Sequence, residues 1–170
     1  TKSVTKKVSA HNKCLTSVTS VAKGGVVSAG KDNLVKLWSA ELSNLATFDL
    51  GVVVWNAVID MTESKILAST SAGDLMEIVI DSGYIGRLVT GNRTIWGNAE
   101  SGLSSPGPLA ICCNVAACGN DGSITAGADG IVRKWSKDGG AIPSATHSLG
   151  SSASAVACDG SVVAVGLGSG

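Results

Sequence analysis

The sequence carries no net charge and no long apolar run, and these two absences exclude several classes of protein. Its 170 residues contain 13 basic and 13 acidic side chains. A neutral domain is not suited to neutralising the phosphates of a nucleic acid. No apolar run approaches the 18 or so residues that span a bilayer, and the first residues lack the apolar core of a secretory signal. We therefore expect a cytoplasmic protein with no nucleic-acid or membrane partner.

Paired cysteine motifs are also missing. The five cysteines form an odd set with no C-x-x-C spacing, which predicts neither a zinc site nor a disulfide framework. We expect them to be buried, reduced and structural. They are Cys14, Cys112, Cys113, Cys118 and Cys158.

What the sequence does contain is a repeat. Residues 27–38 read VSAGKDNLVKLW, and residues 124–135 read ITAGADGIVRKW. Each copy alternates apolar and polar residues on either side of a short turn with an Asp, and each ends in Trp. This pattern is typical of two short strands joined by a tight turn.

The repeat has a period of about 40 residues. Trp96 follows Trp55 by 41 residues, and Leu75 follows Leu34 by the same number. A period of this length with four short strands per unit is the signature of a β-propeller. We predict an all-β fold, a partial propeller of about three and a half blades, with units at residues 11–51, 52–93, 94–146 and 147–170. Because closed propellers have more blades, the chain is expected to be part of a larger propeller.

The period fails at residues 99–115. This segment contains Gly102, Pro106 and Pro108, and a central strand does not tolerate prolines. Two alternatives stay open: an insertion within the third unit, or the flank of a missing segment. In either case we expect a loop outside the sheets, and an inserted loop would be a candidate for partner contact.

Polar residues recur at matching places in the units and resemble the hydrogen-bonded network of WD-repeat blades. The resemblance implies that a His bonds the Asp of the turn and that the Trp indole bonds a strand hydroxyl. A Ser, a His and an Asp in one unit would also fit nucleophilic catalysis, but groups that recur once per blade are better explained by blade structure. The residues are His11, Ser28, Asp32, Trp38, Thr125, Asp129, Trp135 and His147. We expect both Asp residues in tight turns and both Trp residues buried between blades.

The second unit is similar to the echinoderm microtubule-associated protein-like (EMAP-like) family. The similarity rests on residues 65–78 (KILASTSAGDLMEI), 87–91 (RLVTG) and 95–97 (IWG), with Glu77 at the Trp position of the blade. Asn92 and Asn98 depart from the family pattern. The resemblance implies a microtubule-associated or axonemal scaffold that binds tubulin or other cytoskeletal proteins, located at the cytoskeleton or in a cilium.

Charge offers a second indication of a partner. Lys2, Lys6, Lys7 and Lys13 gather near the N-terminus, and a basic rim suits the acidic surface of a microtubule. The alternative is that these lysines protect an edge strand. No phosphate loop, calcium loop or nucleophile elbow is present, so we expect no catalytic residue, metal, cofactor or small-molecule substrate. The competing functions are a general protein assembly platform and, less favoured, a propeller enzyme.

Overall fold

The computed structural model describes residues 6–60, 63–89, 112–117, 122–136 and 145–170, and within these ranges it contains strands and no helix. The first sheet has the order β1-β2-β3-β4 and the second the order β5-β6-β7-β8. Both are antiparallel throughout. The strands of the first sheet are β1 (Leu15–Ser20), β2 (Val26–Gly30), β3 (Leu34–Trp38) and β4 (Asn44–Asp49). Those of the second are β5 (Val54–Ile59), β6 (Lys65–Thr70), β7 (Leu75–Val79) and β8 (Tyr84–Val89).

The third sheet repeats this order, and a two-stranded sheet follows it. The third consists of β9 (Cys112–Ala117), β10 (Ser123–Gly127), β11 (Ile131–Trp135) and β12 (Ala145–Ser148). The last pair is β13 (Ala153–Cys158) and β14 (Val163–Leu167). The all-β prediction with four antiparallel strands per blade is confirmed.

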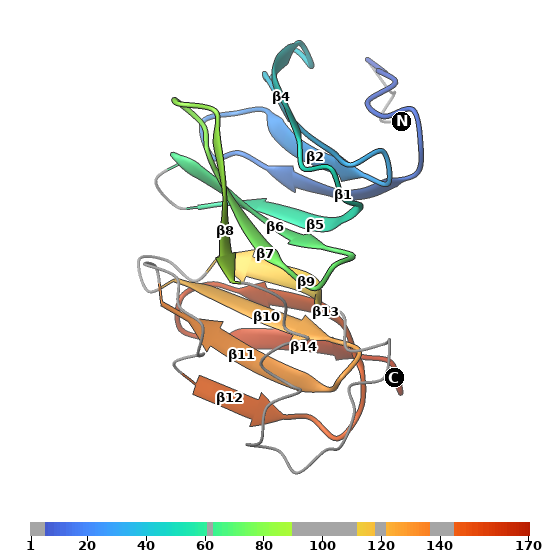
Figure 1. Ribbon diagram of the computed structural model, residues 1–170, viewed down its shortest axis with the longest axis vertical. Coiled ribbons are helices and arrows are strands. Elements are labelled where there is room, and N and C mark those ends of the chain that lie inside the picture. Colours follow the sequence, from blue (N-terminus) through green and yellow to red (C-terminus); the bar gives the residue numbers. More distant parts are fainter. Residues whose placement is uncertain (1–5, 61–62, 90–111, 118–121, 137–144) are drawn as a thin grey trace, which may run out of the picture.

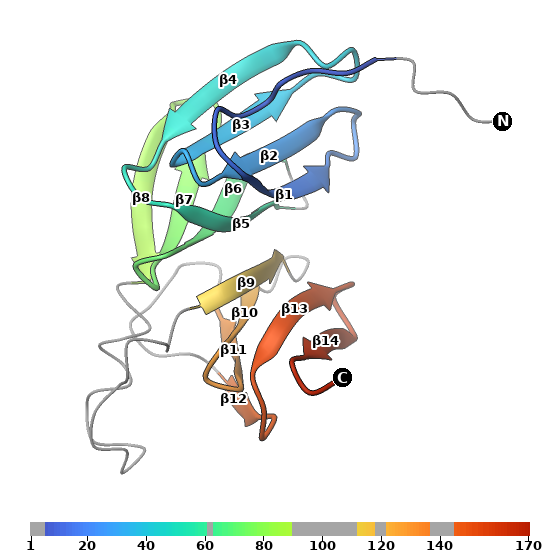
Figure 2. The same ribbon diagram turned by 90° about the vertical axis from the view of Figure 1, so that its right-hand side faces the viewer.

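The sheets follow one another as blades, and the first strand of each blade lies beside the first strand of the next (Figures 1 and 2). Side chains join these strands by hydrogen bonds. Thr16 donates to the Val54 carbonyl (2.7 Å) and Thr19 to the Ala57 carbonyl (2.8 Å). Asn56 donates in turn to the Val115 carbonyl of the third blade (3.1 Å). The inner strands of successive blades therefore run side by side in nearly the same register.

Turns between the second and third strands of each blade need a residue with positive φ. Asn33 (φ 72°), Gly73 (φ 82°) and Gly130 (φ 71°) occupy the same place in the first three blades. Asn and Gly adopt this conformation most readily. A Cβ on Gly130 would lie 2.6 Å from the Ser151 carbonyl oxygen, so this glycine also permits close approach of the segment that leads into the next blade.

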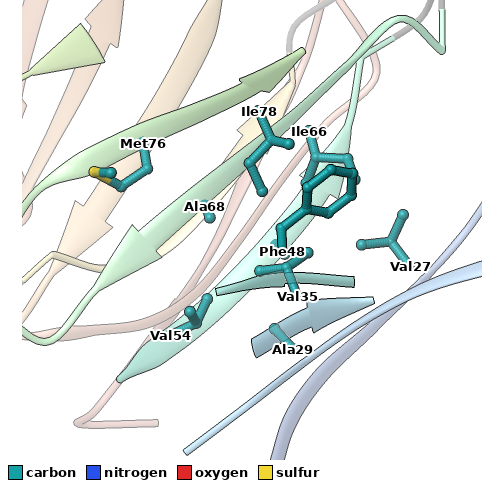
Figure 3. Packing of buried hydrophobic residues seen from close by; sticks show 10 residues of the cluster. Val27, Ala29, Val35, Phe48, Val54, Ile66, Ala68, Met76 and Ile78 are labelled. Atoms are coloured by element: carbon teal, nitrogen blue, oxygen red, sulfur yellow. The ribbon is translucent and has the colours of Figure 1, made fainter. Parts of the chain in front are cut away.

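Alternation along the strands divides the core into two layers. Val27 and Val35 of the first sheet pack against Ile66 and Ile78 of the second, together with Phe48 (Figure 3). The opposite face of the second sheet presents Leu67 and Leu75, which contact Val115 and Trp135 of the third sheet. Since neighbouring residues of a strand face opposite sides, β6 supplies both layers.

The predicted boundary at residues 146 and 147 falls inside β12, which closes the third sheet at Ser148. The fourth unit therefore begins after β12. Most of the irregular segment 99–115, with Gly102, Pro106 and Pro108, lies outside the described residues; its last residues form the start of β9.

The cysteine prediction is wrong in two respects. Cys158 is disulfide-bonded, whereas we expected reduced thiols throughout. Cys14 is free but exposed, because it lies in the segment that leads into β1 and not in the core.

Candidate functional site

The first blade holds a chain of hydrogen bonds that joins four of the predicted residues. The Trp38 indole donates to Ser28 Oγ (2.8 Å), and Ser28 Oγ lies 2.8 Å from His11 Nε2. His11 Nδ1 lies 2.8 Å from Asp32 Oδ1. β2 and β3 position Ser28 and Trp38, while the segment before β1 brings His11 to the turn that holds Asp32. The structure thus brings His11, Ser28, Asp32 and Trp38 together; we call this set the blade network.

A neutral imidazole satisfies every polar atom of this chain. An indole N–H can only donate, so Ser28 accepts from Trp38 and directs its own proton to His11 Nε2. The Nδ1 proton of His11 then goes to the Asp32 carboxylate. Asp32 also accepts from the Asn12 amide (3.2 Å) and the Leu34 amide (3.4 Å). The network therefore fixes the turn and the segment before β1 to the sheet.

Two opposing effects act on the pKa of the Asp32 carboxyl. Burial raises its pKa, but the hydrogen bonds from His11, Asn12 and Leu34 outweigh burial, so its pKa lies below the ordinary 3.8. A carboxyl whose pKa is lower when folded stabilises the protein above its unfolded pKa and loses that contribution as the pH falls through the folded pKa.

We expect the variant Asp32→Asn to lose less stability in acid than the wild type. Urea unfolding followed by circular dichroism from about pH 6 to about pH 2 would measure the free energy of unfolding. The wild-type curve should fall more steeply below about pH 4, because only the wild type must protonate this carboxylate. Asp49→Asn, which removes an exposed carboxyl on β4, is the control for the loss of one negative charge. Identical slopes for the wild type and Asp32→Asn would contradict the assignment.

The third blade keeps part of this arrangement, with an arginine as the partner of the Asp carboxylate. The Trp135 indole donates to Thr125 Oγ1 (2.8 Å), as Trp38 does to Ser28. Asp129 accepts from the Ile131 amide (3.0 Å) and from the Arg133 guanidinium (2.8 Å). Arg133 thus takes the place that the family resemblance gave to a histidine. The sequence signal for it was a basic residue four positions after the Asp.

In the second blade, apolar residues occupy the positions that correspond to Ser28, Asp32 and Trp38 of the blade network. The strand registers align Ala68 with Ser28 and Ile78 with Trp38. The turn of the same length places Ala72 where Asp32 stands. Glu77, predicted at the Trp position, is one residue away and pairs with Lys65 (2.9 Å) on the other face of the sheet. The prediction for Glu77 is wrong: Glu77 follows Trp38 by 39 residues, whereas the strand registers set the equivalent positions of these two blades 40 residues apart.

His147 does not occupy the place predicted from its spacing. It lies on β12, exposed, with its backbone opposite Val132. The register of β13 with β14 aligns Leu149 with His11. His11 precedes Gly30 by 19 residues and His147 precedes Gly166 by 19, but this shared spacing is coincidental and the prediction for His147 was wrong.

The two tryptophans are both buried but in different surroundings. Trp135 lies between the second and third blades with 1% of its surface exposed. Trp38 is 7% exposed and faces the flank of the first sheet that no other described sheet covers. Lys36 lies over its ring (5.8 Å to the centroid) and donates to the Ala10 carbonyl. The expectation of burial between blades thus fits Trp135 but not Trp38.

The Ser, His and Asp of the first blade do not form a reactive site. Ser28 is only 2% exposed, and its oxygen already accepts the Trp38 indole proton. A nucleophile must reach a substrate carbon, and here the sheet and the segment before β1 cover the hydroxyl. Among the described residues, no group of three His, Cys, Asp or Glu side chains is placed to hold a metal ion, and no helix could cross a membrane.

The predicted contact lysines lie on the segment that crosses the open flank of the first sheet. Lys6, Lys7 and Lys13 are exposed and lie outside strands. Lys6 donates to the Glu41 carbonyl. The sequence did not single out Lys31, which follows β2 and lies over the Trp55 ring of the next blade (5.4 Å to the centroid). Lys2, Gly102, Pro106 and Pro108 are outside the described residues.

Three solved structures share this fold. The computationally designed Ika4 protein aligns with a TM-score of 0.68 and 18% identity, over 96% of this chain and 91% of its own. The WD40 β-propeller domain of Doa1 aligns with a TM-score of 0.68 and 19% identity, over 94% of this chain and 50% of its own. The designed Ika8 protein gives 0.59 and 19% over 92% of this chain and 44% of its own. No family model and no curated protein matches the sequence.

The sheet order, the blade network and these alignments define the class of the fold as a WD40-type β-propeller. The described residues form three four-stranded blades and one further hairpin. This agrees with the predicted three and a half blades. The chain spans half the length of the matched Doa1 chain.

Proposed function

We propose that this chain is a protein-binding scaffold of the microtubule-associated or axonemal type, similar to the EMAP-like family and located at the cytoskeleton in the cytoplasm or a cilium. The observation that carries the binding role is the burial of the reactive groups. The Ser, His and Asp of the first blade are used inside the blade, while lysines remain on the surface. Stacked sheets of this kind hold their loops and flanks in fixed positions for protein contacts.

The microtubule partner rests on the family resemblance and on the exposed lysines. Lys6 and Lys7 are exposed and lie outside strands. Together with Lys13 they lie on the segment before β1, which Lys36 and Asp32 hold against the first sheet. A group of exposed cations suits an acidic protein surface, because complementary charges attract the two partners.

Co-sedimentation with taxol-stabilised microtubules tests the proposal. We expect the 170-residue chain to pellet with microtubules at low salt and less as salt rises, since salt screens exposed charges. The double variant Lys7→Ala and Lys13→Ala should bind roughly tenfold more weakly. Lys23→Ala removes an exposed lysine that pairs with Glu63 in the turn between β1 and β2; it is the control and should bind like the wild type.

The results separate the competing functions. Failure to pellet at any salt would exclude the microtubule partner and leave a general assembly platform. Equal loss of binding in the Lys23→Ala control would show that total charge, not the segment before β1, governs association. The enzyme alternative would need a substrate-accessible set of catalytic groups, and the described residues show only the buried blade network.

A further inference from the structure

Two serines of the sequence have basic residues at the third and second positions before them. Residues 6–9 (KKVS) end in Ser9, and residues 133–136 (RKWS) end in Ser136. Protein kinases select substrates by charge patterns of this kind, because basic side chains pair with acidic groups beside the active site of the kinase. The hydroxyl must also reach the γ-phosphate of ATP inside that active site. The surroundings of each serine in the fold therefore decide which one a kinase can use.

The third blade makes the pattern before Ser136 inaccessible. β11 pairs with β10 on one side and with β12 on the other. The Arg133 side chain is 7% exposed and bonds the Asp129 carboxylate (2.8 Å), and Trp135 is 1% exposed. A kinase would reach Arg133 only after the blade had opened. In the folded chain these residues are part of the blade and are not a recognition motif.

The segment that contains Ser9 is exposed and belongs to no sheet. Residues 6–9 are all exposed and lie outside strands. Ser9 Oγ has no hydrogen-bond partner among the described residues. Side-chain bonds from Lys6 and Lys36 to backbone carbonyls hold residues 6–10 to the first sheet. Releasing so few bonds at the surface is a local opening that leaves the blade intact.

We propose that Ser9 is a phosphorylation site for a kinase that recognises basic residues, and that its phosphate weakens the lysine surface around it. Ser9 Oγ attacks the γ-phosphorus of ATP, its proton passes to the catalytic base of the kinase, and ADP leaves with the electrons of the broken phosphorus–oxygen bond. Lys6, Lys7 and Lys13 together carry three positive charges on this segment. A phosphate of charge about −2 lowers that sum to about +1. The effect on a partner rests on the proposed function, whereas the modification itself does not.

Treatment of the 170-residue chain with cyclic-AMP-dependent protein kinase and ATP tests the site. We expect tandem mass spectrometry to locate phosphate on Ser9, and the variant Ser9→Ala to take up none. The double variant Lys6→Ala and Lys7→Ala should be modified about tenfold or more slowly, because it lacks the basic pair. Ser43→Ala removes an exposed serine with an acidic residue two positions before it; it is the control and should be modified like the wild type. An unmodified Ser9, a rate that does not depend on the two lysines, or equal modification of Ser136 would overturn the assignment.

Co-sedimentation of the phosphorylated chain with microtubules tests the effect of the charge. We expect binding about tenfold weaker than that of the unmodified chain at the same salt, with recovery after phosphatase treatment. Ser9→Ala that has been treated with the kinase should bind like the unmodified wild type. Equal pelleting of the phosphorylated and unmodified chains would overturn this part of the proposal.

The experiments separate this inference from the proposed function. If the unmodified chain does not pellet at all, the microtubule proposal fails, and mass spectrometry still decides whether Ser9 is the site. Immobilised poly-glutamate then replaces the microtubule as the acidic surface. Unchanged binding to poly-glutamate after phosphorylation would overturn the effect of the phosphate on the lysine surface.

Discussion

Replacing Trp135 with Ala should lower the free energy of unfolding by about 3–5 kcal/mol. The side chain is 1% exposed and packs with Leu67, Leu75 and Val115 between two blades. Removing it leaves a cavity at that junction, and it leaves the Thr125 hydroxyl without the indole donor. Urea unfolding followed by far-ultraviolet circular dichroism measures the loss without relying on tryptophan fluorescence.

Two further substitutions separate packing from hydrogen bonding. Trp135→Phe keeps most of the ring volume and removes the N–H, so it should cost about 1–2 kcal/mol. Trp38→Ala makes the same change on the flank of the first sheet, where Lys36 lies over the ring and donates to the Ala10 carbonyl. It should cost about 2 kcal/mol, because that cover can settle into the space. A loss below about 1 kcal/mol for Trp135→Ala would show that this junction does not hold the blades together.

The fold could be predicted because the blades repeat the same short sequence pattern of strands and turns. The Asp turns, the alternating strands and the terminal Trp of residues 27–38 and 124–135 were visible in the sequence, and the strands lie where the pattern set them. The second blade shows why spacing alone was less exact. It lacks the Ser, Asp and Trp that fix the alignment, so its leucines were matched one residue out of register.

The residues that form the network of the first blade could be predicted from the sequence. The way the network differs in the later blades could not. Nothing local to His147 distinguishes a network histidine from one on an outer strand; only the pairing of β13 with β14 does so. The role of Arg133 depends on a strand turning its side chain back toward Asp129.

The apolar composition of the second blade explains how the propeller tolerates loss of the network. Ala68 and Ile78 are fully buried against the first sheet in the places of Ser28 and Trp38. With the serine, the aspartate and the tryptophan all absent, no buried donor is left without an acceptor at these positions. Replacing both partners of a buried hydrogen bond is far less costly than removing one.

Because removing one partner of a buried pair is costly, the second large effect is expected at Asp129. Asp129→Ala should cost about 3 kcal/mol, because it withdraws the carboxylate from the Arg133 guanidinium, whose side chain is 7% exposed. Arg133→Met should cost less, about 1 kcal/mol, since the Asp129 carboxylate keeps the Ile131 amide and the methionine fills apolar space. The double variant should then be more stable than Asp129→Ala alone. Chemical unfolding of the four proteins gives the coupling energy.

If the double variant is instead less stable than Asp129→Ala, Arg133 stabilises the blade by packing and by its other contacts. The buried guanidinium would then not need the Asp129 carboxylate as its partner.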